Sequence, residues 1–199
     1  FLANREAGVV LTSTEAAAFV TSVFEYDWKI AKPWATPTDG IDDDDIRMMR
    51  NATRLEPFPL PSSNRSHYVP KRASYVANVA VATSPDAGAT VVREALLSTR
   101  HSLRIYTYQI TDVDIADVIL DLIRERDVRV SMVLSRAIFM DSDRTASTKV
   151  VEYMRENARG NGTMSLRSSP HFFRYAHLKV LIVDDERVVV ATGNLSPSD

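Results

Sequence analysis

The sequence contains no cysteine, little lysine and no long uninterrupted apolar run. The absence of cysteine excludes disulfide bonds and zinc sites with thiolate ligands. Because no stretch of about 18 apolar residues occurs, no membrane-spanning helix is expected within these residues. The net charge of −2 over 199 residues gives no overall basic character that would favour nucleic acid. The few lysines are Lys29, Lys32, Lys71, Lys149 and Lys179.

The composition is that of an ordinary soluble globular protein, with 45% apolar and 25% charged residues. Its length is sufficient for one α/β domain with a sizeable core. Composition alone therefore does not point to a function, whereas local motifs do.

The most informative pattern is His177, Lys179 and Asp184, spaced as His-x-Lys-x4-Asp. Side chains two apart on a strand point to the same face, so His177 and Lys179 are predicted to project into one pocket. The apolar run 180–183 predicts a strand buried on both faces. Asp184 is expected at the end of this strand, just before a turn.

A second apolar run, Arg187 to Ala191, predicts a return strand that brings Thr192 and Asn194 near the same pocket. An imidazole, an ammonium, a hydroxyl and an amide form a set suited to a phosphodiester. The imidazole transfers protons or attacks phosphorus, and the ammonium binds a phosphate oxygen. This chemistry requires no metal or other cofactor.

These residues give the chain a resemblance to the phospholipase D superfamily, which carries His-x-Lys-x4-Asp-x6-Gly-Ser-x-Asn. The matching positions are His177, Lys179, Asp184 and Asn194. Ala191 and Thr192 stand where the family usually has Gly and Ser. Thr192 keeps a hydroxyl for a phosphate hydrogen bond, whereas Ala191 adds a methyl group where backbone approach is needed.

The resemblance implies a metal-independent phosphodiesterase or phosphatidyltransferase that cleaves a phospholipid through a phosphohistidine. It implies two His-Lys-Asp sets, of which one is visible here. The other set is expected from an upstream half of the same protein or from a second copy. In that case His177 is the general acid/base, and Asp184 orients or charge-stabilises an imidazole.

The segment Asn4 to Val10 resembles the one that closes a half-domain in two-motif members of this family. We therefore expect residues 1–34 to be the tail of an upstream half. Residues 35–74, rich in proline and aspartate, are expected to be a linker or excursion. Residues 75–199 are expected to be the second half, which carries the motif.

From residue 75 onward, predicted strands and helices alternate. The predicted strands are 75–83, 103–108, 128–134, 164–167, the motif strand and its return strand; the predicted helices follow Ser84-Pro85-Asp86, Asp112 and Thr145. A further helix over 15–28 is expected to be capped by Thr14. This order predicts the α/β class, as a phospholipase D-like α/β/α sandwich with a mixed, largely parallel central sheet.

Three further residues are candidates for lining the substrate: Gln109 at the end of a predicted strand, and His171 and Tyr175 just before the motif. Tyr108 is assigned mainly to core packing. Two alternatives to the lipid enzyme remain open. One is a nuclease of the same superfamily and the other a non-catalytic scaffold subunit. The arginines available for a nucleic-acid groove are Arg136, Arg167 and Arg174.

Asn-x-Ser/Thr sites at Asn51, Asn64 and Asn161 fall in predicted loops. They favour a secreted or lumenal location, where such asparagines carry glycans. The same sequon at Asn194 is expected to stay bare, because a glycan there would block the proposed pocket.

Overall fold

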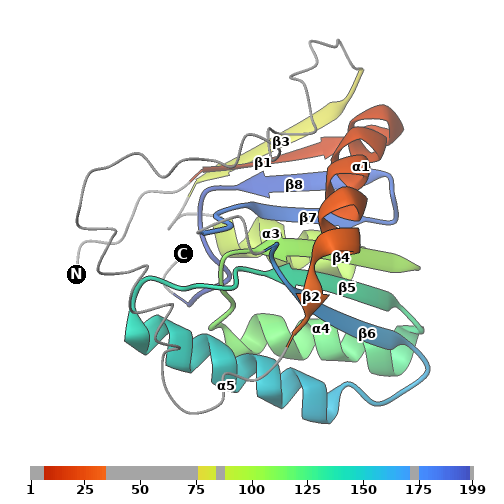
Figure 1. The fold of residues 1–199 in the computed structure, drawn as a ribbon. Coiled ribbons are helices and arrows are strands. Elements are labelled where there is room, and N and C mark those ends of the chain that lie inside the picture. Colours follow the sequence, from red (N-terminus) through yellow and green to blue (C-terminus); the bar gives the residue numbers. More distant parts are fainter. Residues whose placement is uncertain (1–6, 35–75, 84–87, 171–174, 198–199) are drawn as a thin grey trace, which may run out of the picture.

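The structure, a computed structural model, describes residues 7–34, 76–83, 88–170 and 175–197. Figure 1 shows a twisted sheet with helices on both sides. In chain order the elements are β1 (Ala7–Thr12), α1 (Thr14–Ile30), β2 (Lys32–Pro33), β3 (Asn78–Thr83), α3 (Gly88–Leu97), β4 (Ser102–Thr107), α4 (Val113–Arg126), β5 (Arg129–Leu134), α5 (Asp141–Asn157), β6 (Thr163–Ser168), β7 (Lys179–Val183) and β8 (Arg187–Ala191).

The strands form one eight-stranded sheet in the order β2-β6-β5-β4-β7-β8-β1-β3. β4 pairs in parallel with β5, and β5 with β6, whereas the other neighbouring strands pair antiparallel. The carboxyl ends of β4, β5, β6 and β8 and the amino end of β7 therefore lie along one edge of the sheet. We call this the carboxyl edge, and the other end of these strands the opposite edge.

The predicted α/β class and the mixed sheet are confirmed, but fewer strand pairs are parallel than expected. Parallel pairing needs a crossover, which α4 supplies between β4 and β5 and α5 supplies between β5 and β6. β7 starts at the edge where β6 ends, and it therefore runs antiparallel to β4. A short turn at 184–186 then makes β8 antiparallel to β7.

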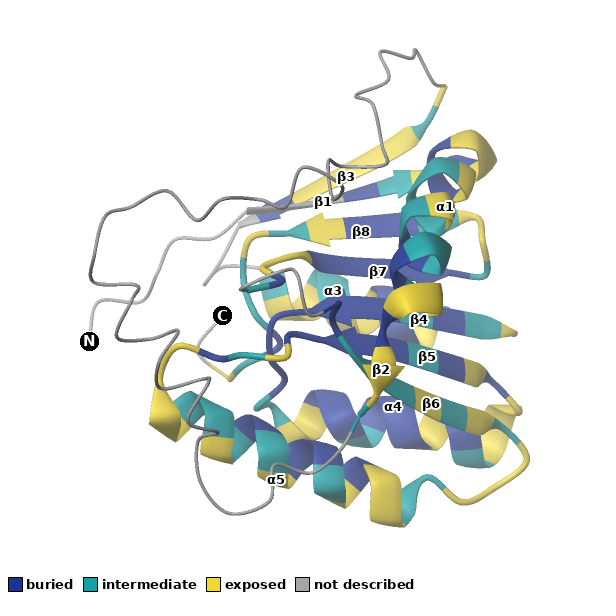
Figure 2. Ribbon diagram, in the orientation of Figure 1, coloured by how far each residue is buried: buried dark blue, intermediate teal, exposed yellow. Residues whose placement is uncertain are grey.

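Helix α1 covers one face of the sheet, and α3, α4 and α5 cover the other (Figure 1). Along β4, Leu103 and Ile105 belong to the larger core beneath α4, whereas Tyr106 packs with Phe24 of α1. This alternation is the period of two that a strand with both faces covered requires. Figure 2 shows that the central strands are buried, in agreement with a three-layer arrangement.

The helix starts are set by side chains at their first turns. Asp112 caps α4 as predicted, accepting a hydrogen bond from the Ile115 N–H at 3.1 Å. The cap of α1 is Ser13 rather than the predicted Thr14, because the Ser13 hydroxyl accepts from the Ala16 N–H at 3.3 Å and Thr14 is already helical. α5 begins at Asp141, several residues before the predicted Thr145, with carboxylates in its first turn that offset the positive helix end.

Residues 7–34 contribute to the same sheet as the motif. β1 lies between β8 and β3. β2 pairs with β6 and is the last strand on the other side of the sheet. The assignment of 1–34 to an upstream half stays a prediction, and the predicted linker, 35–74, lies wholly outside the described residues. No helix in the described ranges is long and apolar enough to cross a membrane.

Candidate active site

His177 and Lys179 lie together at the carboxyl edge, where the chain enters β7. The Lys179 Nζ atom lies 2.8 Å from both ring nitrogens of His177, so it donates to whichever nitrogen holds the lone pair. Lys179 is only 5% exposed, whereas the His177 side chain is exposed. The predicted adjacency of the two side chains is confirmed, although His177 precedes the strand instead of lying within it.

An aromatic cluster surrounds this pair. The Tyr108 ring centroid lies 4.9 Å from that of His177, and Lys179 Nζ lies 5.8 Å from the Tyr108 ring. The Tyr108 hydroxyl accepts a hydrogen bond from the Phe139 N–H at 2.6 Å. Burial raises the pKa of Tyr108 and so favours the neutral hydroxyl. Tyr108 is thus a buried packing residue, as predicted, and also one wall of the histidine site.

Gln109 follows Tyr108 and is buried, with its amide nitrogen 3.4 Å from Asp143 of α5. Its amide oxygen is also buried and has no hydrogen-bond partner among the described residues. Asp143 was not identified from the sequence. Its position in the first turn of α5, directly after β5, is the signal that places it at the carboxyl edge.

Thr192 and Asn194 follow β8 at the same edge. Leu195 anchors this segment, because its carbonyl accepts from the N–H groups of Thr111 and Asp112 at 2.8 and 3.1 Å. Asn194 is half-buried and Thr192 is exposed. The return strand therefore brings both residues to the edge that holds His177, as the spacing predicts.

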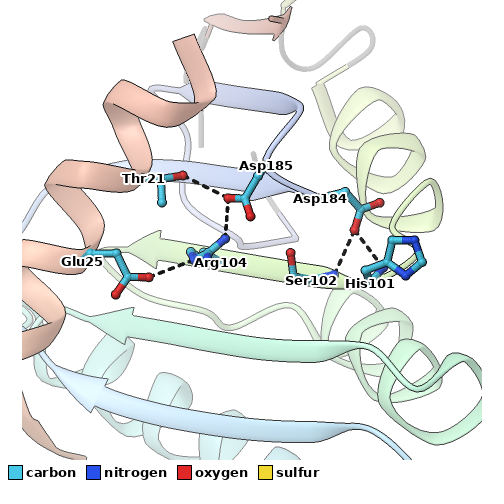
Figure 3. A network of polar contacts seen from close by, with 7 residues as sticks. All are labelled: Thr21, Glu25, His101, Ser102, Arg104, Asp184 and Asp185. Carbon is cyan, nitrogen blue, oxygen red and sulfur yellow. Dashed lines mark hydrogen bonds and ion pairs between the residues drawn. The ribbon is translucent and has the colours of Figure 1, made fainter. Parts of the chain in front are cut away.

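Asp184 lies at the opposite edge, so the prediction that it orients an imidazole of the site is wrong. The five residues of β7 span about 16 Å at about 3.3 Å per residue, and they separate Asp184 from His177. The Asp184 carboxylate instead accepts hydrogen bonds from the backbone N–H groups of Arg100, His101 and Ser102, at 2.9, 2.8 and 2.9 Å. Figure 3 shows the contacts with His101 and Ser102. Desolvation opposes its ionisation, but these three donors outweigh that effect and hold the pKa of Asp184 below its usual value.

Asp185, the next residue in the turn, joins a second set of polar contacts (Figure 3). Its carboxylate accepts from Arg104 at 2.6 Å and from the Thr21 hydroxyl at 3.2 Å. Arg104 also donates to Glu25 at 3.2 Å. These contacts attach α1 to β4 and to the β7–β8 turn, so they stabilise the fold and lie away from the carboxyl edge.

The remaining predicted residues have three different outcomes. Tyr175 lies at the site, with its ring centroid 6.4 Å from Tyr108. His171 and Arg174 lie outside the described residues. Arg167 does not face a groove, because its guanidinium donates to the carbonyls of Trp28 and Ala31 at the end of α1.

The carboxyl edge thus presents an accessible imidazole held by a buried ammonium, with amide and hydroxyl groups nearby. This arrangement can bind an anionic oxygen and transfer a proton to or from it. In the described ranges, no group of three or more histidine or acidic side chains is placed to hold a metal ion.

Comparison with known proteins gives a family for this arrangement. The profile described as "Cardiolipin synthase, PLD-like domain" matches residues 92–199, which is more than half of the chain. None of the curated proteins matches the chain significantly.

Several solved structures match part of the chain. Nuc from Salmonella typhimurium, a phospholipase D family member, shares 21% identity with a TM-score of 0.42, over 58% of this chain and 82% of that one. NucT from Helicobacter pylori shares 21% identity with a TM-score of 0.41, over 54% and 67%. TrmBL2, an archaeal chromatin protein, shares 16% identity with a TM-score of 0.36, over 88% and 57%. On the strength of the family match, the chain belongs to the phospholipase D superfamily.

Proposed function

We propose that His177 and Lys179 form one half of a phosphodiesterase site that cleaves a phospholipid at its headgroup phosphate. One observation carries the proposal: a buried ammonium lies against an exposed imidazole at the carboxyl edge. A charge in weakly polar surroundings attracts an anion more strongly than the same charge in water. A phosphodiester that reaches the His177 ring therefore meets a fixed positive charge beside it.

In the proposed reaction, one imidazole nitrogen attacks phosphorus, and the bond from phosphorus to the leaving alcohol breaks. A second imidazole donates a proton to the leaving oxygen. It then takes a proton from the water or alcohol that attacks the phosphohistidine, whose P–N bond breaks. We assign this second role to His177.

The attacking imidazole belongs to another His-Lys set. The attacking and leaving groups of an in-line displacement lie on opposite sides of phosphorus, so one ring cannot fill both roles at once. We propose that the second set comes from an upstream half of the protein or from a second copy of this chain.

Lys179 is proposed to bind a non-bridging phosphate oxygen, and its contact with His177 holds the imidazole next to that oxygen. Asn194 and Thr192 are proposed as neutral donors to the same phosphate. Ala191, half-buried at the end of β8, stands where the superfamily usually has glycine, so its methyl group narrows the approach to this segment.

A lipid substrate is favoured over nucleic acid by charge. Nucleic-acid binding depends mainly on several basic side chains that contact phosphates along the strand. Of the arginines considered for such a groove, Arg167 is bound to the end of α1. Arg136 is exposed at the carboxyl edge, next to the acidic first turn of α5.

The test compares choline release from phosphatidylcholine micelles by the wild type and by His177→Asn, with the upstream half present so that both sets are available. The variant is expected to lose turnover by about a hundredfold or more, because a general acid/base contributes roughly 10²–10⁴ to the rate. His101→Asn is the matched control, because His101 is also exposed but lies at the opposite edge.

Choline release that persists in His177→Asn contradicts the assignment. Cleavage of single-stranded DNA without choline release would show that the substrate is nucleic acid and not a phospholipid. Retained binding of inorganic phosphate with no turnover of either substrate indicates a non-catalytic scaffold. Circular dichroism of each variant separates these results from misfolding.

A further inference from the structure

We infer that the carboxyl edge docks on the surface of a zwitterionic phospholipid membrane through a set of exposed apolar side chains around the candidate site. This inference rests on the proposed lipid function. The set, here called the apolar rim, consists of Val113, Phe139, Met140 and Leu178, which are 50%, 69%, 57% and 43% exposed.

The apolar rim is confined to one edge of the molecule, although its members come from three parts of the chain. Val113 opens α4 just after β4, Phe139 and Met140 lie between β5 and α5, and Leu178 directly precedes β7. All three connections meet the sheet at the carboxyl edge. Figure 2 shows the start of α5 as exposed. Apolar side chains gathered at one such place indicate an interaction surface, whereas a single exposed one does not.

The apolar rim is physically joined to the proposed catalytic histidine. The Phe139 N–H donates to the Tyr108 hydroxyl, and the Phe139 ring centroid lies 6.5 Å from that of Tyr175. Tyr108 in turn contacts the His177 ring, at 4.9 Å between centroids. Phe139 is therefore linked to the imidazole through Tyr108, by one hydrogen bond and one ring contact, so a surface that receives Phe139 lies close to His177.

The side chains next to the rim indicate the kind of surface. Asp141 and Arg144 form an ion pair at 2.9 Å, Arg136 is exposed, and Asp143 adds another carboxylate. Mixed charges of this kind match zwitterionic headgroups, which carry both signs. They do not match a polyanion, because carboxylates repel the phosphates of a nucleic-acid strand.

The chemistry of the rim favours lipid for a second reason. Besides phosphate contacts along its backbone, single-stranded nucleic acid is held by bases stacked on aromatic rings. Val113, Met140 and Leu178 are aliphatic and offer no stacking surface. Aliphatic and aromatic groups together suit the boundary between headgroups and acyl chains, where both are removed from water.

The experiment measures partition onto phosphatidylcholine vesicles by co-sedimentation, which requires no turnover. The wild-type chain is expected to bind, and Phe139→Ser and Met140→Ser are each expected to reduce the partition coefficient about tenfold. Leu97→Ser is the matched control. Leu97 is 41% exposed at the end of α3, away from the carboxyl edge, so its loss should leave partition unchanged.

Failure of the docking inference and failure of the proposed function are distinguishable. His177→Asn is expected to bind vesicles like the wild type while losing choline release. If the wild type does not bind, or if Leu97→Ser lowers binding as much as Phe139→Ser, the docking inference is overturned even where choline is released. Binding of a single-stranded oligonucleotide that Phe139→Ser abolishes, without vesicle binding, would also overturn it. Thermal unfolding of each variant confirms that the fold is retained.

Discussion

The Asp184 carboxylate accepts a hydrogen bond from the Ser102 backbone N–H at 2.9 Å, at the end of β7 remote from His177. This contact and two like it join the β7–β8 turn to the start of β4. The aspartate of the motif therefore stabilises the sheet, whereas the histidine and lysine form the site. Its φ of 52° is in the left-handed region, which Asp tolerates better than most residues.

Replacing Asp184 with Asn is expected to lower the free energy of unfolding by about 1–3 kcal/mol. The amide keeps one acceptor oxygen, but its NH₂ group faces N–H donors that then lack a partner. Urea denaturation at pH 7 measures the change. Asp185→Asn is the matched control for the turn, and it tests the Arg104 contact separately. Equal stability of wild type and Asp184→Asn would contradict this role.

The difference between wild type and Asp184→Asn is expected to depend on pH. Because the pKa of Asp184 is lower in the folded than in the unfolded chain, its contribution is fully present above the unfolded value of about 3.9. That contribution is lost as the pH falls through the folded value. The urea midpoints of wild type and Asp184→Asn should therefore lie closer together at pH 3 than at pH 7. A difference that grows on acidification would show the opposite sign of the shift.

Replacing Lys179 with Met is expected to abolish phosphate binding and turnover without lowering stability. Methionine fills a similar volume, and removing a buried charge is often neutral or stabilising. Loss of a preorganised charge at the reacting phosphate typically costs about 10²–10³ in rate. Lys149→Met, at an exposed position on α5, is the control. Phosphate titration and choline release provide the two measurements. Unchanged phosphate affinity in Lys179→Met would show that Lys179 does not bind the phosphate.

Two substitutions of Tyr108 separate the contribution of its ring from that of its hydroxyl. Tyr108→Phe leaves the Phe139 N–H without its acceptor, so the free energy of unfolding is expected to fall by about 1 kcal/mol. Tyr108→Ala also removes the ring beside His177, and misplacement of the imidazole is expected to lower turnover by up to about a hundredfold. Equal turnover in the two variants would show that the ring does not position His177.

Gly162→Ala is expected to destabilise the fold by about 1–3 kcal/mol, as other overpacking substitutions do. A Cβ atom there would clash with the Val128 carbonyl oxygen and lie 2.9 Å from that of Ile123, so the loop would have to move away from α4. Asn161→Ala, at the exposed position between two glycines, should change stability by less than about 0.5 kcal/mol. Thermal unfolding of the two variants provides the comparison.

The parts of the fold that could be predicted are those whose signals are local. The apolar run from Val180 to Val183 correctly predicted a strand, and Asp112 correctly predicted the start of a helix. Both features depend only on residues that are neighbours in the sequence. The adjacency of His177 and Lys179 also follows from local geometry. Ser13 and Thr14 could not be separated, because adjacent hydroxyls offer the same cap.

The role of Asp184 could not be predicted, because its partners are backbone N–H groups. Such donors exist at nearly every position, so Arg100, His101 and Ser102 carry no signal that an aspartate more than 80 residues later binds them. The share of parallel pairing was overestimated for a similar reason. Strand order depends on which connections cross the sheet, and alternation along the sequence does not determine it.

The place of β1 between β8 and β3 has a consequence for synthesis of the chain. The strands Ala7–Thr12 and Arg187–Ala191 pair although they are far apart in the sequence. Their pairing therefore forms late in folding and raises the contact order. In a nascent polypeptide β3 can pair with one side of β1 early, but the side of β1 that pairs with β8 stays exposed until β8 leaves the ribosome. Assistance from chaperones during translation would therefore matter most for this first strand.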